Sequence, residues 1–194
     1  MTVIYGNRGD MDTLMLPSIW ERLDNVNVVE IGLRTFHFED RVAEAIANED
    51  DTLILCGHGT SWGLLHPNFH TGQYIIHENN YRDIHARNLI CVWCHAADFA
   101  ERYHVNGFFS SMFISNVNEA QEHLGIGNDI TEVQIGDSEL TFCKRLNALL
   151  RDGTPLNEWV PTLKSLMNEN NMVERYNYNG LKFFENYEGD FYTK

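Results

Sequence analysis

Two residues with the chemistry for nucleophilic catalysis, His58 and Cys94, each follow a short apolar segment. The first segment covers residues 52–56 and the second covers residues 89–93. Apolar runs of this length are typical of buried parallel strands, and functional side chains gather at the carboxyl ends of such strands. If the two strands are neighbours in a sheet, the imidazole lies beside the thiol. Because a neighbouring base favours the nucleophilic thiolate, this pattern predicts cysteine catalysis.

Two glycines, Gly57 and Gly59, flank His58 and allow the backbone to turn sharply and to approach a ligand closely. We expect the backbone N–H groups of Gly59 and Cys94 to form an oxyanion site, which would stabilise negative charge on a reacting oxygen. The plain alternative is that His58 and Cys94 are ordinary residues at strand ends. Their occurrence together, on successive strands, favours the catalytic interpretation.

The two segments together resemble the caspase-like cysteine peptidases, a group that includes caspases, legumains, gingipains, clostripain and the CHAT domains. The resembling pattern is an apolar block that ends in His-Gly, followed some 36 residues later (58 to 94) by a block that ends in Cys. The resemblance covers roughly residues 2–118. It implies a caspase-like α/β/α sandwich, a His58–Cys94 dyad, and an oxyanion site at Gly59 and the Cys94 amide.

Two positions next to Cys94 depart from the family pattern. Trp93 stands where family members usually have a small residue, and Val92 stands where caspases have glutamine. A bulky residue beside the nucleophile is consistent with a relative that has lost its activity. A non-catalytic binding or scaffold domain with the same fold is therefore the alternative from a different functional class.

In the resembling peptidases, three segments build the pocket for the substrate residue before the scissile bond. They are the loop after the first strand, the position two before the nucleophile and the loop after the fifth strand. In this chain the first loop holds Arg8 and Asp10, the position before the nucleophile is Val92, and the last loop holds Ser115 and Asn116. A guanidinium at Arg8 would select Asp or Asn in the substrate, whereas a carboxylate at Asp10 would select Arg or Lys. Caspases and legumains use an arginine from the first of these segments, so the resemblance favours Arg8 and an acidic or amide residue in the substrate.

A zinc site is the alternative that the cysteines themselves suggest. Its four candidate ligands are Cys56, His58, Cys91 and Cys94. Successive residues of a strand point to opposite faces, however, so Cys91 is expected to be a buried, inert thiol in a helix layer. Residues 91–95 also match the C-x-x-C-H motif of covalent haem attachment, which we set aside because its first cysteine falls inside an apolar strand. We therefore predict no metal and no other cofactor.

The rest of the chain alternates between strand and helix signals, which is typical of a mainly parallel sheet covered by helices on both faces. Strands are expected over residues 2–5, 26–31, 52–56, 89–93 and 108–114. Helices are expected over residues 14–23, 38–48, 98–103 and 138–151, with another beginning at residue 154. Residues 61–87 break this rhythm and are expected to form a long loop with a hairpin near residues 74–77.

The C-terminal region carries a hairpin signal. Val173–Tyr178 and Leu181–Asn186 flank Asn179-Gly180, and Asn-Gly suits the positive φ angles of a type I′ turn. We find no repeat, linker or low-complexity segment, so a single domain accounts for residues 1–194. The predicted fold class is therefore α/β, a three-layer α/β/α sandwich with a mainly parallel central sheet and an added C-terminal β-hairpin.

The 194 residues carry a formal net charge of −14, which argues against a nucleic-acid binder that depends on phosphate contacts. The chain has no apolar stretch of about 18 residues, so a membrane-spanning segment is not expected. The N-terminal residues do not match an export signal, and four cysteines in such a chain are expected to be reduced. We therefore expect a cytoplasmic protein that acts on protein or peptide substrates.

Overall fold

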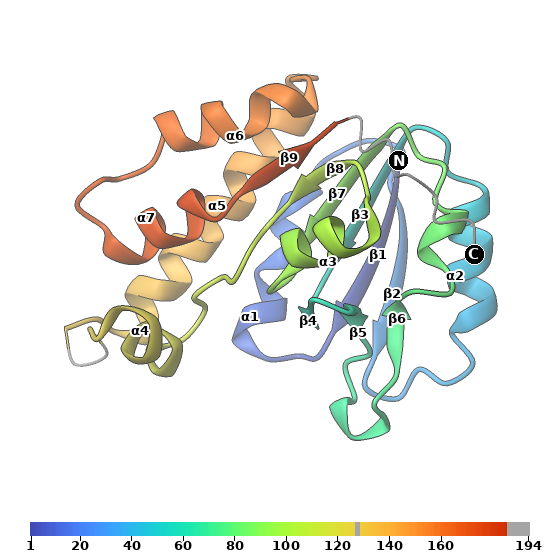
Figure 1. Cartoon of the computed structure of the whole chain (residues 1–194), viewed down its shortest axis with the longest axis horizontal. Helices are drawn as coiled ribbons and strands as arrows, with labels where there is room; N and C mark the ends of the chain where they lie inside the picture. The colour runs from blue at the N-terminus through green and yellow to red at the C-terminus, as the bar shows by residue number, and fades with distance from the viewer. Residues whose placement is uncertain (127–128, 186–194) are drawn as a thin grey trace.

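The computed structural model describes residues 1–126 and 129–185, and a six-stranded sheet forms the centre of this part of the chain (Figure 1). Across the sheet the strands follow the order β2 (Asn27–Gly32), β1 (Thr2–Asn7), β3 (Thr52–Cys56), β7 (Asn88–Val92), β8 (Gly107–Phe109) and β9 (Lys182–Phe184). The first five strands run parallel, and β9 pairs antiparallel with β8. The prediction of a mainly parallel α/β sheet is confirmed.

The two strands that precede His58 and Cys94 lie side by side in the middle of the sheet. β3 and β7 pair in parallel, with Leu55 opposite Cys91. Every residue of β3 is buried, and β7 is buried from its second residue onward. A strand that is covered on both faces needs an uninterrupted apolar sequence. The two apolar blocks therefore follow from this central position, and the expected adjacency of the strands is confirmed.

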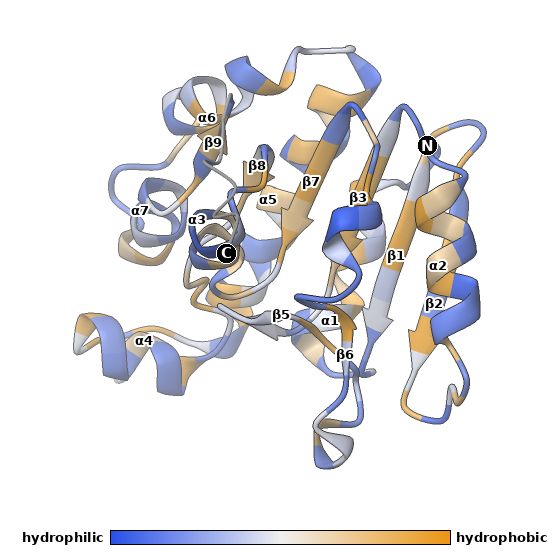
Figure 2. Cartoon of the chain, turned by 45° about the vertical axis from the view of Figure 1, so that its right-hand side comes forward, coloured by the Kyte–Doolittle hydropathy of each residue, from blue (hydrophilic) through white to orange (hydrophobic). Residues whose placement is uncertain are grey.

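Helices cover both faces of the sheet. α2 (Glu39–Ala47) and α3 (Ala96–Tyr103) pack on one face, and α5 (Glu132–Arg151) and α6 (Leu156–Ser165) pack on the other. Each helix buries residues spaced three or four positions apart, such as Val42 and Ile46 of α2. Figure 2 shows the apolar side of α2 toward the sheet and its polar side toward solvent.

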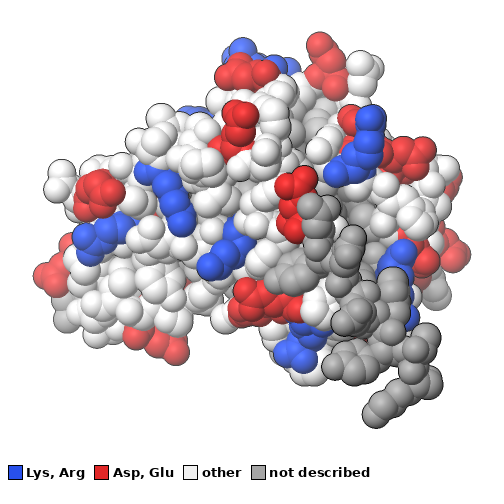
Figure 3. Space-filling model, turned by 45° about the horizontal axis from the view of Figure 1, so that its top comes forward, with Lys and Arg blue, Asp and Glu red and all other residues white. Residues whose placement is uncertain are grey.

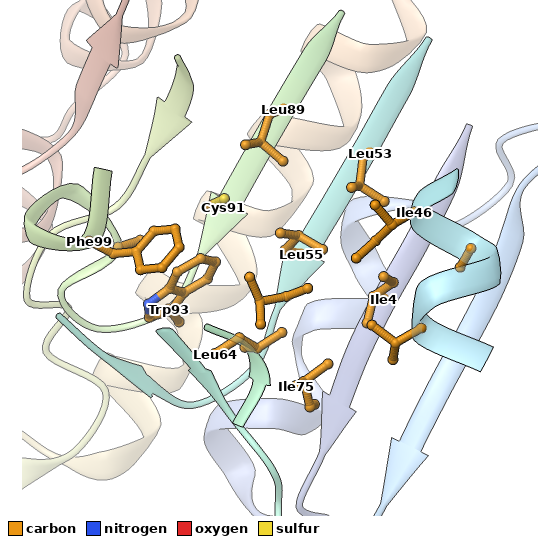
Figure 4. Close-up of a cluster of buried hydrophobic side chains, with 14 of the residues drawn as sticks. Ile4, Ile46, Leu53, Leu55, Leu64, Ile75, Leu89, Cys91, Trp93 and Phe99 are labelled. Carbon is orange, nitrogen blue, oxygen red and sulfur yellow. The ribbon is translucent and has the colours of Figure 1, made fainter. Parts of the chain in front are cut away.

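A second, three-stranded sheet stands over the face that carries α2 and α3. It consists of the antiparallel strands β4 (Gly59–Thr60), β5 (Gly63–Leu65) and β6 (Tyr74–Ile76). Leu64 and Ile75 are fully buried and join the same apolar cluster as Ile4 and Leu55 of the large sheet (Figure 4). Residues 61–87, which also include the 3-10 turns η2 (Phe69–Thr71) and η3 (Tyr81–Asp83), are therefore more regular than the long loop that was predicted.

The continuous helix predicted for residues 14–23 is wrong. The chain forms the short helix α1 (Met11–Leu14) and then the 3-10 turn η1 (Leu16–Ile19). Pro17 has no N–H to donate to the Thr13 carbonyl, and the Tyr5 hydroxyl donates to that carbonyl instead, at 2.5 Å. This break keeps the helix to a single turn directly after β1.

The predicted C-terminal hairpin is also wrong, because residues 173–178 belong to a helix. α7 (Met172–Asn179) begins after Asn171, whose side chain accepts the N–H of Glu174 at 3.0 Å. Gly180 adopts a φ of −75°, not the positive φ that a type I′ turn requires. β9 pairs with β8 instead of with the preceding segment, and Asn186, the last residue of the predicted strand, lies outside the described residues.

Two other helix starts differ from the prediction. α3 begins at Ala96 and not behind a cap at Asp98, whereas α5 begins at Glu132 (not 138), where Thr131 and Gln134 cap each other reciprocally. α4 (Val117–Leu124) lies between β8 and α5 in the chain and was not predicted. Within the described ranges, no helix is both long enough and apolar enough to cross a membrane.

Candidate active site

The segments that follow β1, β3 and β7 meet at the carboxyl edge of the large sheet. From β1 the chain crosses to β2 on one side and then returns to β3 on the other side. The connections of β1 and β3 therefore diverge and leave a crevice, which is where ligands bind in open α/β sheets. Asp10 follows β1, His58 follows β3 and Cys94 follows β7.

His58 is held by Asp10, a residue that was predicted only as part of a substrate pocket. The Nε2 atom of His58 lies 2.8 Å from Oδ2 of Asp10. The other carboxylate oxygen of Asp10 accepts the Thr13 N–H at 3.1 Å and the Thr13 hydroxyl at 2.7 Å, because Asp10 caps α1. Burial alone would raise the pKa of Asp10, but the bonds from Thr13 and His58 lower it. Asp10 is therefore an anion that orients the imidazole.

Arg8, the residue favoured above for substrate selection, bonds to groups around the site. Its Nη1 donates to the Pro67 carbonyl at 2.9 Å, and its Nε lies 3.2 Å from Oδ2 of Asp10. Its guanidinium also lies 4.1 Å from the centre of the Phe69 ring, and that ring contacts His58 edge-on. Arg8 thus ties the loop between β5 and β6 to the His58–Asp10 pair. It is not among the described residues that line the cavity beside Cys94.

A cavity of about 50 Å³ lies between the two predicted catalytic residues. His58 and Cys94 both line it, and so do Val92 and Ser115 of the predicted substrate pocket. Asn116 instead caps α4, because its side chain accepts an N–H from the first turn of that helix. A cavity of this size has room for several water molecules or for the head of one side chain.

The lining of the cavity combines apolar walls with carboxyl groups. The apolar part comes from Met15, Leu16, Val92, Phe113 and Phe142, and the carboxyl groups are those of Asp12 and Glu139. Burial raises the pKa of Asp12, against the opposing effect of a hydrogen bond from Ser115. Neither lysine nor arginine contributes to the lining in the part of the chain that the structure describes.

Glu139 is a functional candidate that the sequence motifs did not reveal. It is only 6% exposed, and no hydrogen bond to its carboxyl is found among the described residues. Burial, followed by repulsion from Asp12 and Glu119, raises the pKa of Glu139 to about 9. One signal could have identified it: Glu139 stands four residues after Ile135 and four before Cys143, on the buried stripe of α5, where a charged residue is unusual.

Cys94 lies in a turn that is fixed by residues following β8. Ser110 Oγ accepts the Trp93 N–H at 3.0 Å, and the Ser111 carbonyl accepts the His95 N–H at 3.2 Å. His95 itself has a φ of 68°, in the left-handed region that non-glycine residues seldom occupy. Backbone strain of this kind is common at functional sites, where the surrounding contacts hold it.

The Cys94 thiol is protonated at neutral pH. Burial raises its pKa to about 11, against a hydrogen bond to the Phe113 carbonyl (Sγ to O, 3.6 Å). Repulsion from the carboxylates of Glu119, Asp12 and Glu139 adds to the increase. A thiolate at Cys94 must therefore form during a reaction, as the proton passes to a base.

Trp93, the bulky neighbour of Cys94, packs into the core. It is 2% exposed, its Nε1 donates to the Thr60 carbonyl at 3.2 Å, and its ring contacts Phe99 edge-on (Figure 4). A Cβ atom at Gly59 would overlap the indole of Trp93. Gly59 is therefore required by the packing of this tryptophan, whatever its role toward a ligand.

The zinc site considered above is not assembled. Cys56 belongs to the apolar cluster beneath α5 and α6, whereas Cys91 belongs to the cluster beneath α2 and α3. The two thiols point to opposite faces of the sheet, so they cannot share one ion with His58 and Cys94. Burial raises the pKa of Cys56 and of Cys91 well above the usual value, which makes both thiols inert.

Another group of side chains has the spacing of metal ligands. Of the described residues, Asp10, Asp12 and His58 bring two carboxylate oxygens and one imidazole nitrogen within 4.8 Å of one another. Both oxygens of Asp10 are already bonded, however, to Thr13 on one side and to Arg8 and His58 on the other. An ion would have to replace these bonds, so we interpret the group as a hydrogen-bonded cluster and not as a metal centre.

Comparisons with known proteins do not assign this site. No protein-family model, no curated protein and no solved structure matches the chain. The functional argument therefore depends on the geometry and the chemistry of the cavity.

Proposed function

We propose that this protein is a cysteine-dependent hydrolase of amide bonds, of the caspase-like peptidase type, with Cys94 as nucleophile and His58 as general acid and base. One observation carries the proposal: β3 and β7 are paired neighbours, and the residues that follow them line a single cavity. The parallel sheet with helices on both faces is compatible with a caspase-like sandwich.

Asp10 completes the group as a positioning residue. Because its carboxylate bonds to Nε2 of His58, Nδ1 is the ring nitrogen left to exchange a proton with the thiol or with the substrate. An anion in this position also stabilises the imidazolium that forms when His58 accepts the thiol proton. Asp10 therefore lowers the free-energy cost of moving the proton from the Cys94 thiol, whose pKa is high, to His58.

The reaction proceeds through a thioester. Cys94 Sγ attacks the carbonyl carbon of the amide while its proton passes to His58. The carbon–nitrogen bond then breaks, and His58 returns the proton to the departing amine. Water next attacks the thioester with His58 as base, which releases the carboxylic acid and restores the Cys94 thiol.

Two backbone N–H groups are available for the oxyanion that forms in each step. No acceptor for the Cys94 N–H is found among the described residues. Gly59 of β4 stands opposite Leu64 of β5. The neighbouring pair, His58 and Leu65, is hydrogen-bonded, because the Leu65 N–H donates to the His58 carbonyl. Bonded and non-bonded pairs alternate along antiparallel strands. The Gly59–Leu64 pair is therefore a non-hydrogen-bonded one, and the Gly59 N–H points away from β5. Gly59 and Cys94 remain the proposed oxyanion donors.

Hydrolysis of fluorogenic peptides, varied at the residue before the scissile bond, tests the proposal. Cys94→Ala should abolish turnover, and His58→Ala should lower kcat/KM by about 100-fold or more. His70→Ala is the matched control, since His70 is exposed and does not line the cavity, and it should leave turnover unchanged. Turnover that survives Cys94→Ala would rule the proposal out.

A non-catalytic binding domain is the second candidate, and the high pKa of the Cys94 thiol favours it. The rate of alkylation by iodoacetamide at neutral pH separates the two candidates. In an enzyme the imidazole assists thiolate formation, so His58→Ala should slow the alkylation of Cys94. In a binding domain the rate stays equally slow with and without His58.

A further inference from the structure

The cavity beside Cys94 contains a carboxyl group that is paired with no hydrogen-bond donor and no cation of the described residues. Glu139 lines the cavity from α5 at 6% exposure, with no donor and no cation partner among the described residues. A buried carboxyl is costly unless it is protonated or paired. Ile135 and Cys143, its neighbours on the same stripe, are apolar, so packing alone does not call for glutamate here. No fully buried polar side-chain atom lacks a partner among the described residues, so the unbonded Glu139 oxygens are open to the cavity, where a ligand can reach them.

The rest of the lining suits a long basic side chain. The walls are apolar, from Met15, Leu16, Phe113 and Phe142. Such walls accommodate methylene groups, while the carboxyl groups of Asp12 and Glu139 accommodate a cationic head. The volume of about 50 Å³ admits an ammonium or guanidinium group but not a large aromatic ring.

We propose that this cavity binds the basic side chain of a substrate, that Glu139 and Asp12 pair with its cationic head, and that the head enters as Glu139 releases its proton to solvent. The inference rests on the proposed function, since it places the basic residue of the substrate beside Cys94. The exchange balances in charge, because one cation enters as one proton leaves. Glu139 is thus never left as an unpaired buried anion.

The preference for a cation is local to the cavity. The net charge of −14 attracts cations in general, but Lys and Arg lie among Asp and Glu on the face shown in Figure 3. The titratable groups around Glu139 are Asp10 and Asp12 after β1, His58 after β3, Cys94 after β7, Glu119 of α4, and Glu132 and Cys143 of α5. Carboxyl groups dominate this set, which favours an entering cation.

The release of a proton gives the proposal a pH signature. Burial raises the pKa of Glu139 to about 9, so below this pH a cation can pair with Glu139 only by displacing its proton. The affinity for a permanently charged ligand should therefore rise with pH, by up to about tenfold for each pH unit between roughly pH 6.5 and 8.5. A cation site whose carboxylates are already ionised would show no such increase.

Two probes of equal shape test the proposal: n-butylguanidine, which is charged, and n-butylurea, which is not. NMR titration of the Cys94→Ala protein measures binding without catalysis. We expect saturable binding of n-butylguanidine, at least about tenfold tighter than that of n-butylurea near pH 8.5, and weaker binding near pH 6.5. Glu139→Gln should remove both the preference and the pH dependence. Glu122→Gln removes the same charge from an exposed position and should preserve both.

Three results would overturn the proposal in protein that melts like wild type. They are equal affinities for the two probes, a pH dependence that survives Glu139→Gln, and stoichiometric Zn²⁺ binding that requires Glu139 and excludes n-butylguanidine. Peptide hydrolysis by the Cys94→Ala protein would remove the proposed function but would leave the cation binding measured here intact. The two failures are therefore distinguishable.

Discussion

Two buried glutamates, Glu139 and Glu174, show how differently the fold treats a carboxyl group. Glu139 is 6% exposed and Glu174 is 5% exposed. Glu174 forms an ion pair with Arg145 and accepts the Asn168 N–H at 3.0 Å. Glu139 has neither kind of partner among the described residues. Equal burial with unequal pairing indicates that Glu174 belongs to the structural framework, whereas the unpaired Glu139 is available to the cation proposed above.

The two glutamates can be compared directly because one helix is involved in both cases: α5 contains Glu139 and also contains the partner of Glu174. Arg145 projects from α5, which also carries Glu139, and it joins α5 to α7 through Glu174 and through the Tyr178 hydroxyl at 2.8 Å. Two interior positions of α5 thus differ: Arg145 supplies a cation for a carboxylate, and Glu139, six residues earlier, presents a carboxyl without one. A third buried glutamate, Glu49, is paired with the backbone N–H groups of Asp51 and Thr52, with Thr2 and with the N-terminus, which makes it an intermediate case.

The largest effect on stability is expected from Glu174→Ala. The Arg145 side chain is only 22% exposed, so it loses its anion without gaining full access to water. We expect the free energy of unfolding to fall by about 3–5 kcal/mol, measured by urea denaturation at neutral pH. Glu169→Ala, which changes an exposed glutamate, is the control and should have little effect. A loss below about 1 kcal/mol would contradict the framework role of Glu174.

Glu139→Gln should instead raise the free energy of unfolding, by an amount that depends on pH. The folded-state pKa is raised from 4.5 to about 9, so the stability that comes from the neutral acid is complete below pH 4.5. It is lost as the pH rises toward 9, by at most about 1.4 kcal/mol for each pH unit. The melting temperature of the variant should therefore exceed that of the wild type by a margin that grows from pH 5 to pH 7 and on to pH 9. A constant difference would mean that Glu139 is already ionised in the folded protein.

The smallest effect is expected from Glu49→Gln. Burial alone would raise the pKa of Glu49, but hydrogen bonds from Thr2 and from the N–H groups of Asp51 and Thr52 lower it below 4.5. Its contribution to stability is therefore present above pH 4.5 and is lost as the pH falls through the lower folded value. We expect Glu49→Gln to cost about 1 kcal/mol at neutral pH and much less near pH 3. An equal cost at both values would show that its charge is unimportant.

The strands could be predicted because a strand that is buried on both faces requires a continuous run of apolar residues. Residues 52–56 form β3 as expected, and the block that ends at Cys94 forms its neighbour β7. The meeting of His58 and Cys94 at one cavity follows from these two strands and from the parallel direction of the sheet. Their catalytic roles stay predictions until turnover is measured.

The errors have a common cause, which is that contacts distant in sequence outweighed local signals. The Asn179-Gly180 turn signal was overridden by the cap at Asn171 and by the burial of Tyr178 against α5. Glu139 was not singled out because a glutamate in a helix usually faces water. Its surroundings depend on residues such as Asp12, which lies far from it in the sequence.

The position of β9 has a consequence for synthesis of the chain. The strand is formed by Lys182–Phe184, yet it pairs with β8, which is formed by Gly107–Phe109. Until β9 leaves the ribosome, the β8 edge of the growing sheet has open backbone donors and acceptors. A chain that stops short of Lys182 would keep this edge exposed, so truncated copies are expected to associate through β8 even though β1, β3 and β7 are already complete.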